Sequence, residues 1–127
     1  VKLIDAARAE NVHRYVMVSA MGAADPPAGG GDVFAEYLRA KADADRALEA
    51  SGLEYTIVRP GGLTDDPPTG LVTIGSGLER GQVPRADVAA VLGAVLPAAN
   101  AVGKAFELVS GKAPIEEAVA GLRALGR

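Results

Sequence analysis

The chain has no cysteine, no tryptophan and a single histidine, and aromatic residues make up only 4% of it. The lack of cysteine excludes disulfides, cysteine-ligated zinc and thiol catalysis, and it suits a reducing cytoplasm. With His13 alone, a histidine metal cluster or a histidine-activated serine has little support, so we interpret His13 as structural. No apolar run approaches the roughly 20 residues of a membrane span. We therefore expect a cytoplasmic protein without a signal peptide.

The net charge is also small. The net charge is −3 over 127 residues, and the basic residues are scattered along the chain. A nucleic acid or an anionic membrane would require a concentrated basic surface, so neither is an expected partner. The length suits one domain, residues 1–127, with a core of small side chains. A small-molecule substrate is the partner that remains.

Hydrophobic periodicity predicts strands alternating with helices. Apolar runs rich in β-forming residues indicate strands, and apolar residues repeating every three or four positions indicate helices. Glycine and proline clusters separate the segments. The predicted helices cover 1–10, 32–51, 87–96 and 114–125, and the predicted strands cover 14–19, 54–59, 71–74 and 105–109. Such alternation is typical of a doubly wound α/β fold with a mostly parallel sheet.

The helix around EYLRAKADADRAL contains a lysine at an unexpected position. We predict a buried apolar stripe on this helix through Phe34, Tyr37, Leu38, Ala44 and Leu48. Lys41 lies within that stripe, four residues after Tyr37, so the two side chains share one helix face. An ammonium beside a phenol stabilises the phenolate, and such a pair can exchange a proton with a carbonyl or an alcohol. A structural alternative is that Tyr37 belongs to the core and Lys41 reaches outward to pair with Asp45.

The surrounding sequence favours the functional interpretation. A buried strand ending in Ser19 precedes the helix, and a strand ending in Arg59-Pro60-Gly61-Gly62 follows it. The segments RYVMVSAMGA, EYLRAKADADRALEASGLEYTIVRPGGLTD, VPRADVAAVL and FELVSG together resemble the C-terminal half of the short-chain dehydrogenase/reductase superfamily, in its atypical NAD(P)-binding branch, NmrA-like or epimerase-like. The resemblance implies a Rossmann-like fold and NADP or NAD as cofactor.

The resemblance also implies roles for particular residues. Tyr37 would be the catalytic acid/base, Lys41 would bind the nicotinamide ribose and stabilise the phenolate, and Ser19 would hydrogen-bond the substrate oxygen. Relatives commonly carry a serine pair where this chain has Ser19-Ala20, so Ser19 could instead only cap a strand end. The residues that would line the nicotinamide side are Pro60, Gly61 and Leu63, for which the alternative is a simple turn.

The first half of the family pattern has no counterpart in this chain. The Gly-rich turn that holds the pyrophosphate and the residue that selects the ribose are both missing, and Asp5 is not assigned a family role. The sequence is therefore a fragment or a shortened relative. In the family, further strands pair beside Tyr15 to Ser19. Without them we expect an exposed sheet edge, and with it a homo-oligomer, pairing through that edge, or poor stability.

Two functional classes remain open at this stage. The chain is either the catalytic half of an NAD(P)-dependent oxidoreductase or sugar-nucleotide-epimerase-like protein, or a non-catalytic NmrA-like module that senses cofactor. Other motifs carry less information. Gly75-x-Gly77 lacks the strand-to-helix context of a phosphate loop, and Asp87, near Arg85, suits the positive end of a helix dipole.

Overall fold

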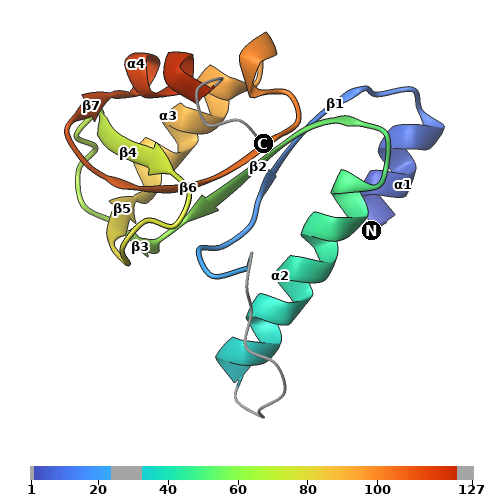
Figure 1. Ribbon diagram of the computed structural model, residues 1–127, viewed down its shortest axis with the longest axis horizontal. Coiled ribbons are helices and arrows are strands. Elements are labelled where there is room, and N and C mark those ends of the chain that lie inside the picture. Colours follow the sequence, from blue (N-terminus) through green and yellow to red (C-terminus); the bar gives the residue numbers. More distant parts are fainter. Residues whose placement is uncertain (1, 24–32, 123–127) are drawn as a thin grey trace.

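The computed structural model describes residues 2–23 and 33–122, and it has an α/β architecture (Figure 1). The elements in chain order are α1 (Lys2–Ala9), β1 (Arg14–Val18), α2 (Val33–Glu49), β2 (Glu54–Pro60), β3 (Gly62–Thr64), β4 (Leu71–Gly75), β5 (Gln82–Pro84), α3 (Arg85–Val95), the 3-10 turn η1 (Ala99–Ala101), β6 (Lys104–Ser110), β7 (Ala113–Pro114) and α4 (Ile115–Ala120). Asp32, the first residue of the predicted 32–51 helix, lies outside the described residues.

The main sheet has the strand order β1-β2-β6-β4-β7. β1, β2 and β6 are parallel, with Val16 opposite Thr56 and Val58 opposite Phe106. β4 runs antiparallel to both β6 and β7. Since parallel neighbours need a crossover, α2 connects β1 to β2, and the segment containing α3 connects β2 to β6. The predicted mostly parallel, Rossmann-like sheet is confirmed.

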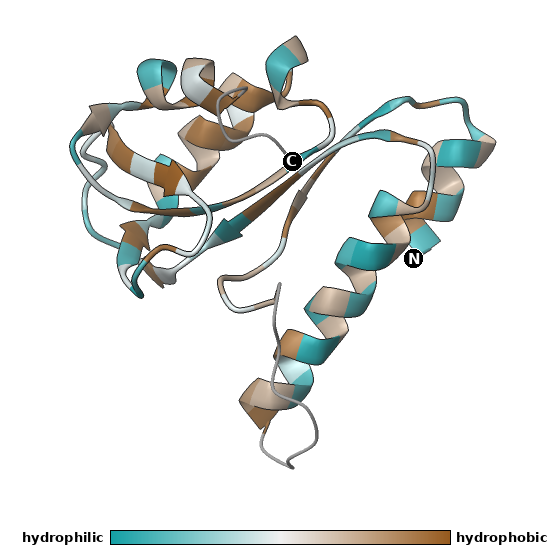
Figure 2. Ribbon diagram, in the orientation of Figure 1, coloured by the Kyte–Doolittle hydropathy of each residue, from teal (hydrophilic) through white to brown (hydrophobic). Residues whose placement is uncertain are grey.

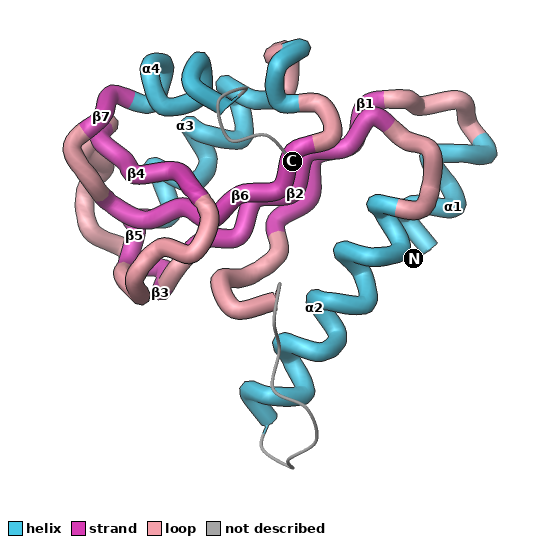
Figure 3. Tube along the Cα trace, in the orientation of Figure 1, coloured by secondary structure: helices cyan, strands magenta, loops and turns pink. Residues whose placement is uncertain are grey.

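Helices cover both faces of this sheet, with α1 and α2 on one side and α3 and α4 on the other (Figure 3). Adjacent β2 residues point to opposite faces, so Ile57 packs against Ile4 and Leu48 while Val58 joins the larger core under α3 and α4. That larger cluster comprises Val58, Val72, Val83, Val88, Val91, Val95, Ala101, Phe106, Leu108, Val119 and Leu122. The predicted doubly wound arrangement is therefore also confirmed.

Polar contacts fasten the start of β1 to the end of α3. The guanidinium of Arg14 donates to the carbonyls of Val95 at 2.8 Å and Leu96 at 3.0 Å, and to Thr56 Oγ1 at 2.7 Å. Carbonyls at a helix C-terminus lack intrahelical partners and carry partial negative charge, so a cation there is stabilising. Burial lowers the pKa of Arg14, and the nearby Glu54 raises it in part.

The buried stripe of α2 differs from the predicted one. Phe34 and Tyr37 are 52% and 46% exposed, although both were expected on the buried stripe. The buried positions are Ala35, Leu38, Ala42, Asp45 and Leu48. The helix is therefore rotated from the predicted orientation, because small alanines pack closely against the sheet and the aromatic rings remain at the surface. The residue that interrupts the fully buried stripe is Asp45, and Lys41 lies at its half-buried margin.

Three short features were not predicted. β3 and β5 form a separate two-stranded parallel sheet, and β7 adds two residues beside β4. Strands of two or three residues are too short to display a period, so the sequence alone carries no signal for them.

The last helix begins after Pro114 and ends at Ala120, before Gly121, whereas the sequence predicted an end near residue 125. Residues 123–127 lie outside the described part. Within residues 2–23 and 33–122, no helix combines the length and the apolar character needed to cross a membrane.

Candidate active site

A cavity of about 370 Å³ lies at the carboxyl ends of β1 and β2, next to the N-terminal half of α2. In open parallel sheets, ligands bind outside the carboxyl ends of the strands. The fold brings every predicted site residue to this cavity, namely Ser19, Tyr37, Lys41, Pro60, Gly61 and Leu63. The lining is completed by Val18, Ala20, Met21, Phe34, Gly62, Arg80 and Gly81. The structure thus brings the six predicted residues together, and their roles remain predictions.

Lys41 connects the helix to the tip of β1. Its Nζ donates to the carbonyl oxygen of Val18 at 3.2 Å and lies 5.6 Å from the centroid of the Tyr37 ring. Ammonium over the face of a phenol at this separation is a favourable cation–π arrangement. The alternative pairing of Lys41 with Asp45 is not observed, since the carboxylate of Asp45 binds another residue. The lysine is thereby fixed between the strand end and the phenol.

The partner of Asp45 is Arg59, at the end of β2. Arg59 Nε and an Arg59 terminal nitrogen each lie 3.0 Å from Asp45 Oδ2, and the two side chains are only 13% and 4% exposed. Asp45 Oδ1 is buried without a hydrogen-bond partner among the described residues. A buried ion pair of this kind fixes position more than it adds stability. It holds α2 against the strand that ends in the Pro-Gly-Gly turn.

Ser19 follows β1 directly and is 3% exposed. Its backbone N–H donates to the carbonyl of Val58 at 2.7 Å, which extends the pairing of β1 with β2. Its hydroxyl is buried and has no hydrogen-bond partner within the part of the chain that the structure describes. Buried polar groups without a partner are uncommon and call for an explanation, and a bound ligand is one such explanation.

The Pro60-Gly61-Gly62 turn brings two backbone segments into close contact. A Cβ at Gly61 would collide with the carbonyl oxygen of Gly81, and that same oxygen accepts a hydrogen bond from Gly62 N–H at 2.9 Å. Gly61 N–H in turn donates to Leu108 O at 2.9 Å. Only glycine permits this approach, which places the loop containing Arg80 beside the end of β2.

The weaker candidates from the sequence, His13 and the Gly75-x-Gly77 segment, lie outside this cavity. His13 is exposed in the turn between α1 and β1. Gly75 ends β4, and Gly77, with φ 65°, belongs to the turn that follows. Among the described residues, no cluster of histidine and acidic side chains could hold a metal ion.

Asp87 fastens a loop and makes no side-chain hydrogen bond that caps α3. Its carboxylate accepts hydrogen bonds from the N–H groups of Thr69 and Gly70, each at 3.0 Å, and from the Thr69 hydroxyl at 3.3 Å. Burial raises the pKa of Asp87, but these hydrogen bonds outweigh burial and bring the pKa below its ordinary value. The nearby Arg85 instead pairs with Asp65 at 2.6 Å on the surface.

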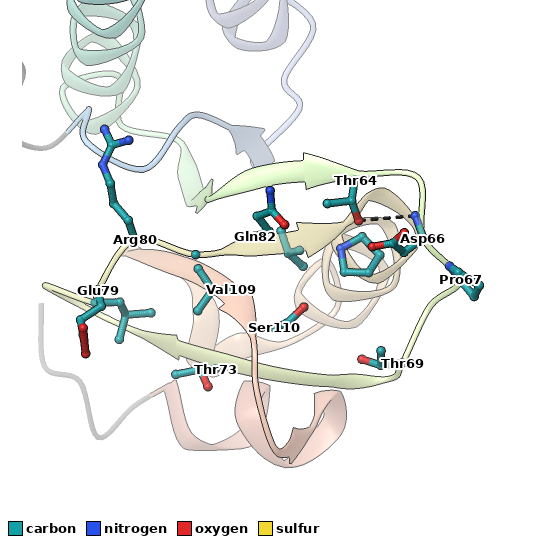
Figure 4. Close-up of a pocket in the computed structure, with 14 residues that line it drawn as sticks. Thr64, Asp66, Pro67, Thr69, Thr73, Glu79, Arg80, Gln82, Val109 and Ser110 are labelled. Carbon is teal, nitrogen blue, oxygen red and sulfur yellow. Dashed lines mark hydrogen bonds between the residues drawn. The ribbon is translucent and has the colours of Figure 1, made fainter.

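The lining residues that sequence reasoning did not place at the site include Phe34, which was expected in the buried stripe, and Arg80. Phe34 stacks on Tyr37 with ring centroids 6.3 Å apart, and the Arg80 guanidinium carbon lies 5.9 Å from the Phe34 centroid. Arg80 lies in a glycine-rich loop with no periodic pattern, so no local signal marked it. It also borders a second, larger cavity of about 850 Å³ (Figure 4).

Comparisons with known proteins agree with this geometry. A family model described as NAD(P)H-binding matches residues 1–99. The chain belongs to this NAD(P)H-binding family. The match confirms the resemblance inferred from the sequence, together with the expected nicotinamide cofactor, NADP or NAD.

Similar proteins and solved structures have names that refer to epimerases and oxidoreductases. The chain is 44% identical over 118 residues to the uncharacterized sugar epimerase YhfK of Bacillus subtilis, covering 93% of this chain and 55% of YhfK. A Bacillus halodurans structure, described as a candidate NAD-dependent epimerase/dehydratase, superposes with a TM-score of 0.88 at 37% identity, over 94% of this chain and 56% of that one. The Lactococcus lactis oxidoreductase ylbE gives a TM-score of 0.86 at 31% identity, over 95% and 57%. The chain thus spans little more than half the length of these relatives.

Proposed function

We propose that this chain supplies the proton-transfer half of an NAD(P)-dependent oxidoreductase or sugar-nucleotide-epimerase-like active site, with Tyr37 as acid/base. The observation that carries the proposal is the position of Lys41, which reaches both the Val18 carbonyl and the Tyr37 ring beside the buried Ser19 hydroxyl. Spacing along a helix would bring Lys41 near Tyr37 in any case, but the contact with the tip of β1 requires the whole fold.

The residues present fit the nicotinamide end of such a cofactor. The cavity is open between α2 and the strand ends, and the unpartnered Ser19 hydroxyl borders it. Lys41 and Tyr37 would hold the ribose hydroxyls, and Pro60, Gly61 and Leu63 would lie beside the ring. The cofactor, when bound, supplies the hydride chemistry. The Gly-rich turn that binds pyrophosphate is absent from residues 1–127, so this proposal covers the nicotinamide side alone.

Each residue has a defined task in the proposed reaction. Tyr37 Oη gives a proton to the substrate oxygen when a carbonyl is reduced, and it takes that proton back when an alcohol is oxidised. The Lys41 ammonium stabilises the phenolate that remains on Tyr37. The Ser19 hydroxyl donates a hydrogen bond to the same substrate oxygen and orients it. Water access is limited on the side of β1 and β2, where Ser19 is buried.

A non-catalytic, cofactor-sensing role is the second candidate. Its specific support is Ala20, which borders the cavity where relatives commonly have a second serine. In that role the same cavity would bind cofactor, and Tyr37 would serve as a stacking surface with Phe34.

Replacing Tyr37 by Phe separates these candidates. An acid/base role predicts that turnover of aldehydes and ketones with NADPH or NADH falls by about 10²–10⁴-fold, as expected for loss of a proton-transfer group. The fold should persist, because Tyr37 is half-exposed. Tyr55→Phe removes a hydroxyl that does not border the cavity and is the matched control. If turnover is unchanged in Tyr37→Phe and calorimetry shows that NADPH still binds, the cofactor-sensing role is the candidate that remains.

The outer edge of β1 supports a further part of the proposal, pairing through the sheet. β1 is the last strand at that side of the described sheet, and its five residues are only partly buried. An unpaired strand edge presents backbone donors and acceptors to any other chain. We expect a dimer or larger species in size-exclusion chromatography, with small molecules and not nucleic acids or membranes as ligands. A cooperatively melting monomer would contradict the pairing.

A further inference from the structure

The two cavities meet at a short segment that belongs to both. Arg80 and Gly81 line the smaller cavity near Tyr37 and also the larger one between β4 and β5. In Figure 4 the Arg80 side chain extends away from the larger cavity toward α2, while Val109 and Ser110 lie at the larger cavity. The guanidinium therefore belongs to the rim of the smaller cavity.

Two stacked rings with a cation at each end form this rim. Arg80 lies over Phe34 at 5.9 Å, Phe34 stacks on Tyr37 at 6.3 Å with an interplanar angle of 23°, and Lys41 lies 5.6 Å from the Tyr37 centroid. The three helix residues are three and four positions apart, so they share one face of α2. This arrangement places Arg80 beyond Phe34, at the opposite end from Lys41.

Stacking on a ring leaves the hydrogen-bonding edge of a guanidinium open. The five N–H donors of arginine lie in the plane of the group, whereas the contact with Phe34 uses its face. Over residues 2–23 and 33–122, no carboxylate is paired with Arg80 and no hydrogen bond from it is formed. Arg80 thus offers two parallel donors in the geometry that binds carboxylate or phosphate.

The charge of the cavity is opposite to that of the chain. Its described lining contains Lys41 and Arg80 and no acidic residue, although the net charge of the chain is −3. Asp66 and Glu79 border only the larger cavity. An anionic ligand is therefore favoured in the smaller cavity.

We propose that Arg80 binds the anionic group of the substrate, so that the substrate class is a carbonyl or alcohol compound that carries a carboxylate or phosphate. This inference rests on the proposed function for the reacting end, where the substrate oxygen meets Tyr37 and Ser19. The anionic end extends along Phe34 to Arg80. Arg80 acts in binding and takes no part in the proton transfer.

Binding of levulinate, an oxo acid, and of its methyl ester tests the proposal without requiring turnover. Two-dimensional NMR titration of the chain measures both. Arg80→Gln should weaken levulinate binding about tenfold or more, the loss expected for hydrogen bonds to a charged group, and leave binding of the ester unchanged. Arg80→Lys should restore part of the affinity, since it keeps the charge without the planar fork.

Arg46→Gln is the matched control, because Arg46 is an exposed arginine of α2 that pairs with Asp43. Equal losses of levulinate affinity in Arg80→Gln and Arg46→Gln would show that the effect depends only on the net charge of the chain, and this would overturn the proposal. So would a wild-type chain that binds the ester as well as the acid, or that shows no saturable binding of the acid.

Two further measurements distinguish substrate binding at Arg80 from cofactor binding at Arg80 and from the proposed proton transfer. If Arg80→Gln weakens binding of NADPH but not of levulinate, the anionic group that Arg80 binds belongs to the cofactor, and the inference about the substrate is overturned. Loss of levulinate binding in Arg80→Gln alongside normal turnover in Tyr37→Phe would keep the anion site and reject the proposed proton transfer.

Discussion

The two faces of the sheet are built differently. The face under α3 and α4 has a continuous hydrocarbon core, whereas the buried cluster under α1 and α2 contains Ile4, Leu48 and Ile57. Hydropathy colours follow this division, since α3 is largely brown and α2 mixes teal with brown (Figure 2). α2 compensates with polar contacts at its inner side, from Asp45 to Arg59 and from Lys41 to Val18.

The difference separates stability from function. Hydrocarbon packing is non-directional and tolerates small shifts, while hydrogen bonds and ion pairs specify distances and angles. The face that carries the candidate site is the one where position depends on a few directional contacts. Substitutions on the α3 face should therefore mainly change stability, and substitutions at the inner side of α2 should change both stability and the site.

The largest effect is expected in the hydrocarbon core. Phe106 is 1% exposed in the middle of β6, and Phe106→Ala should lower the free energy of unfolding by about 3–5 kcal/mol. Urea denaturation followed by circular dichroism measures the change. Phe106→Leu retains most of the volume and should cost much less. A loss below about 1 kcal/mol in the alanine variant would contradict the division between the faces.

The buried ion pair should come next. Asp45→Ala leaves Arg59 largely buried without its carboxylate, and we expect a loss of about 3 kcal/mol in unfolding free energy. Asp43→Ala, two residues earlier, removes the exposed partner of Arg46 and should change stability by less than about 1 kcal/mol. Equal effects would show that α2 is held by its apolar residues. The Asp45 variant should also bind NADPH more weakly, because α2 positions Lys41.

A smaller, pH-dependent effect is expected at Asp87, the polar exception on the α3 face. Asp87→Asn should cost about 2 kcal/mol at neutral pH, because the N–H groups of Thr69 and Gly70 then face a neutral acceptor. The pKa of Asp87 is lower in the folded chain than in the unfolded chain, so its contribution is fully present above the unfolded value, about 3.9. The contribution disappears as the pH falls through the folded value.

Denaturation at several pH values between neutral and acid conditions measures this linkage. The difference between wild type and Asp87→Asn should be constant near neutrality and shrink only below about pH 4. A difference that grows on acidification would contradict the lowered pKa.

The smallest effect is expected for the surface pair of Arg85 and Asp65, whose side chains are 58% and 87% exposed. Arg85→Gln should change the unfolding free energy by at most about 1 kcal/mol and should do so less at high salt. Thermal melts at two salt concentrations measure this. A larger loss that does not depend on salt would mean that polar contacts also stabilise the α3 face, and it would weaken the contrast between the two faces.

Local sequence patterns were sufficient for the main elements, and with the family resemblance they indicated part of the cavity lining. Asn11, with φ 59°, and Gly52, with φ 84°, lie just beyond the ends of α1 and α2, because residues in the left-handed conformation stop a helix. Ser19, Tyr37 and Lys41 converge because strand ends and helix positions follow from chain order in a parallel fold. The exposed rings of Phe34 and Tyr37 were missed because their helical spacing matches an apolar stripe, which usually faces the core.

The sequence by itself determined the alternation of strands and helices, the family, and the approach of Ser19, Tyr37 and Lys41 to the carboxyl ends of β1 and β2, since these depend on local periodicity and chain order. Only the tertiary structure decided that Asp45 pairs with Arg59, that Lys41 reaches Val18, and that Arg80 lies over Phe34. Each of these contacts joins segments distant in sequence, and their geometry depends on how α2 is rotated against the sheet. No local pattern encodes that rotation, because small alanines allow the helix more than one orientation until the whole sheet is assembled.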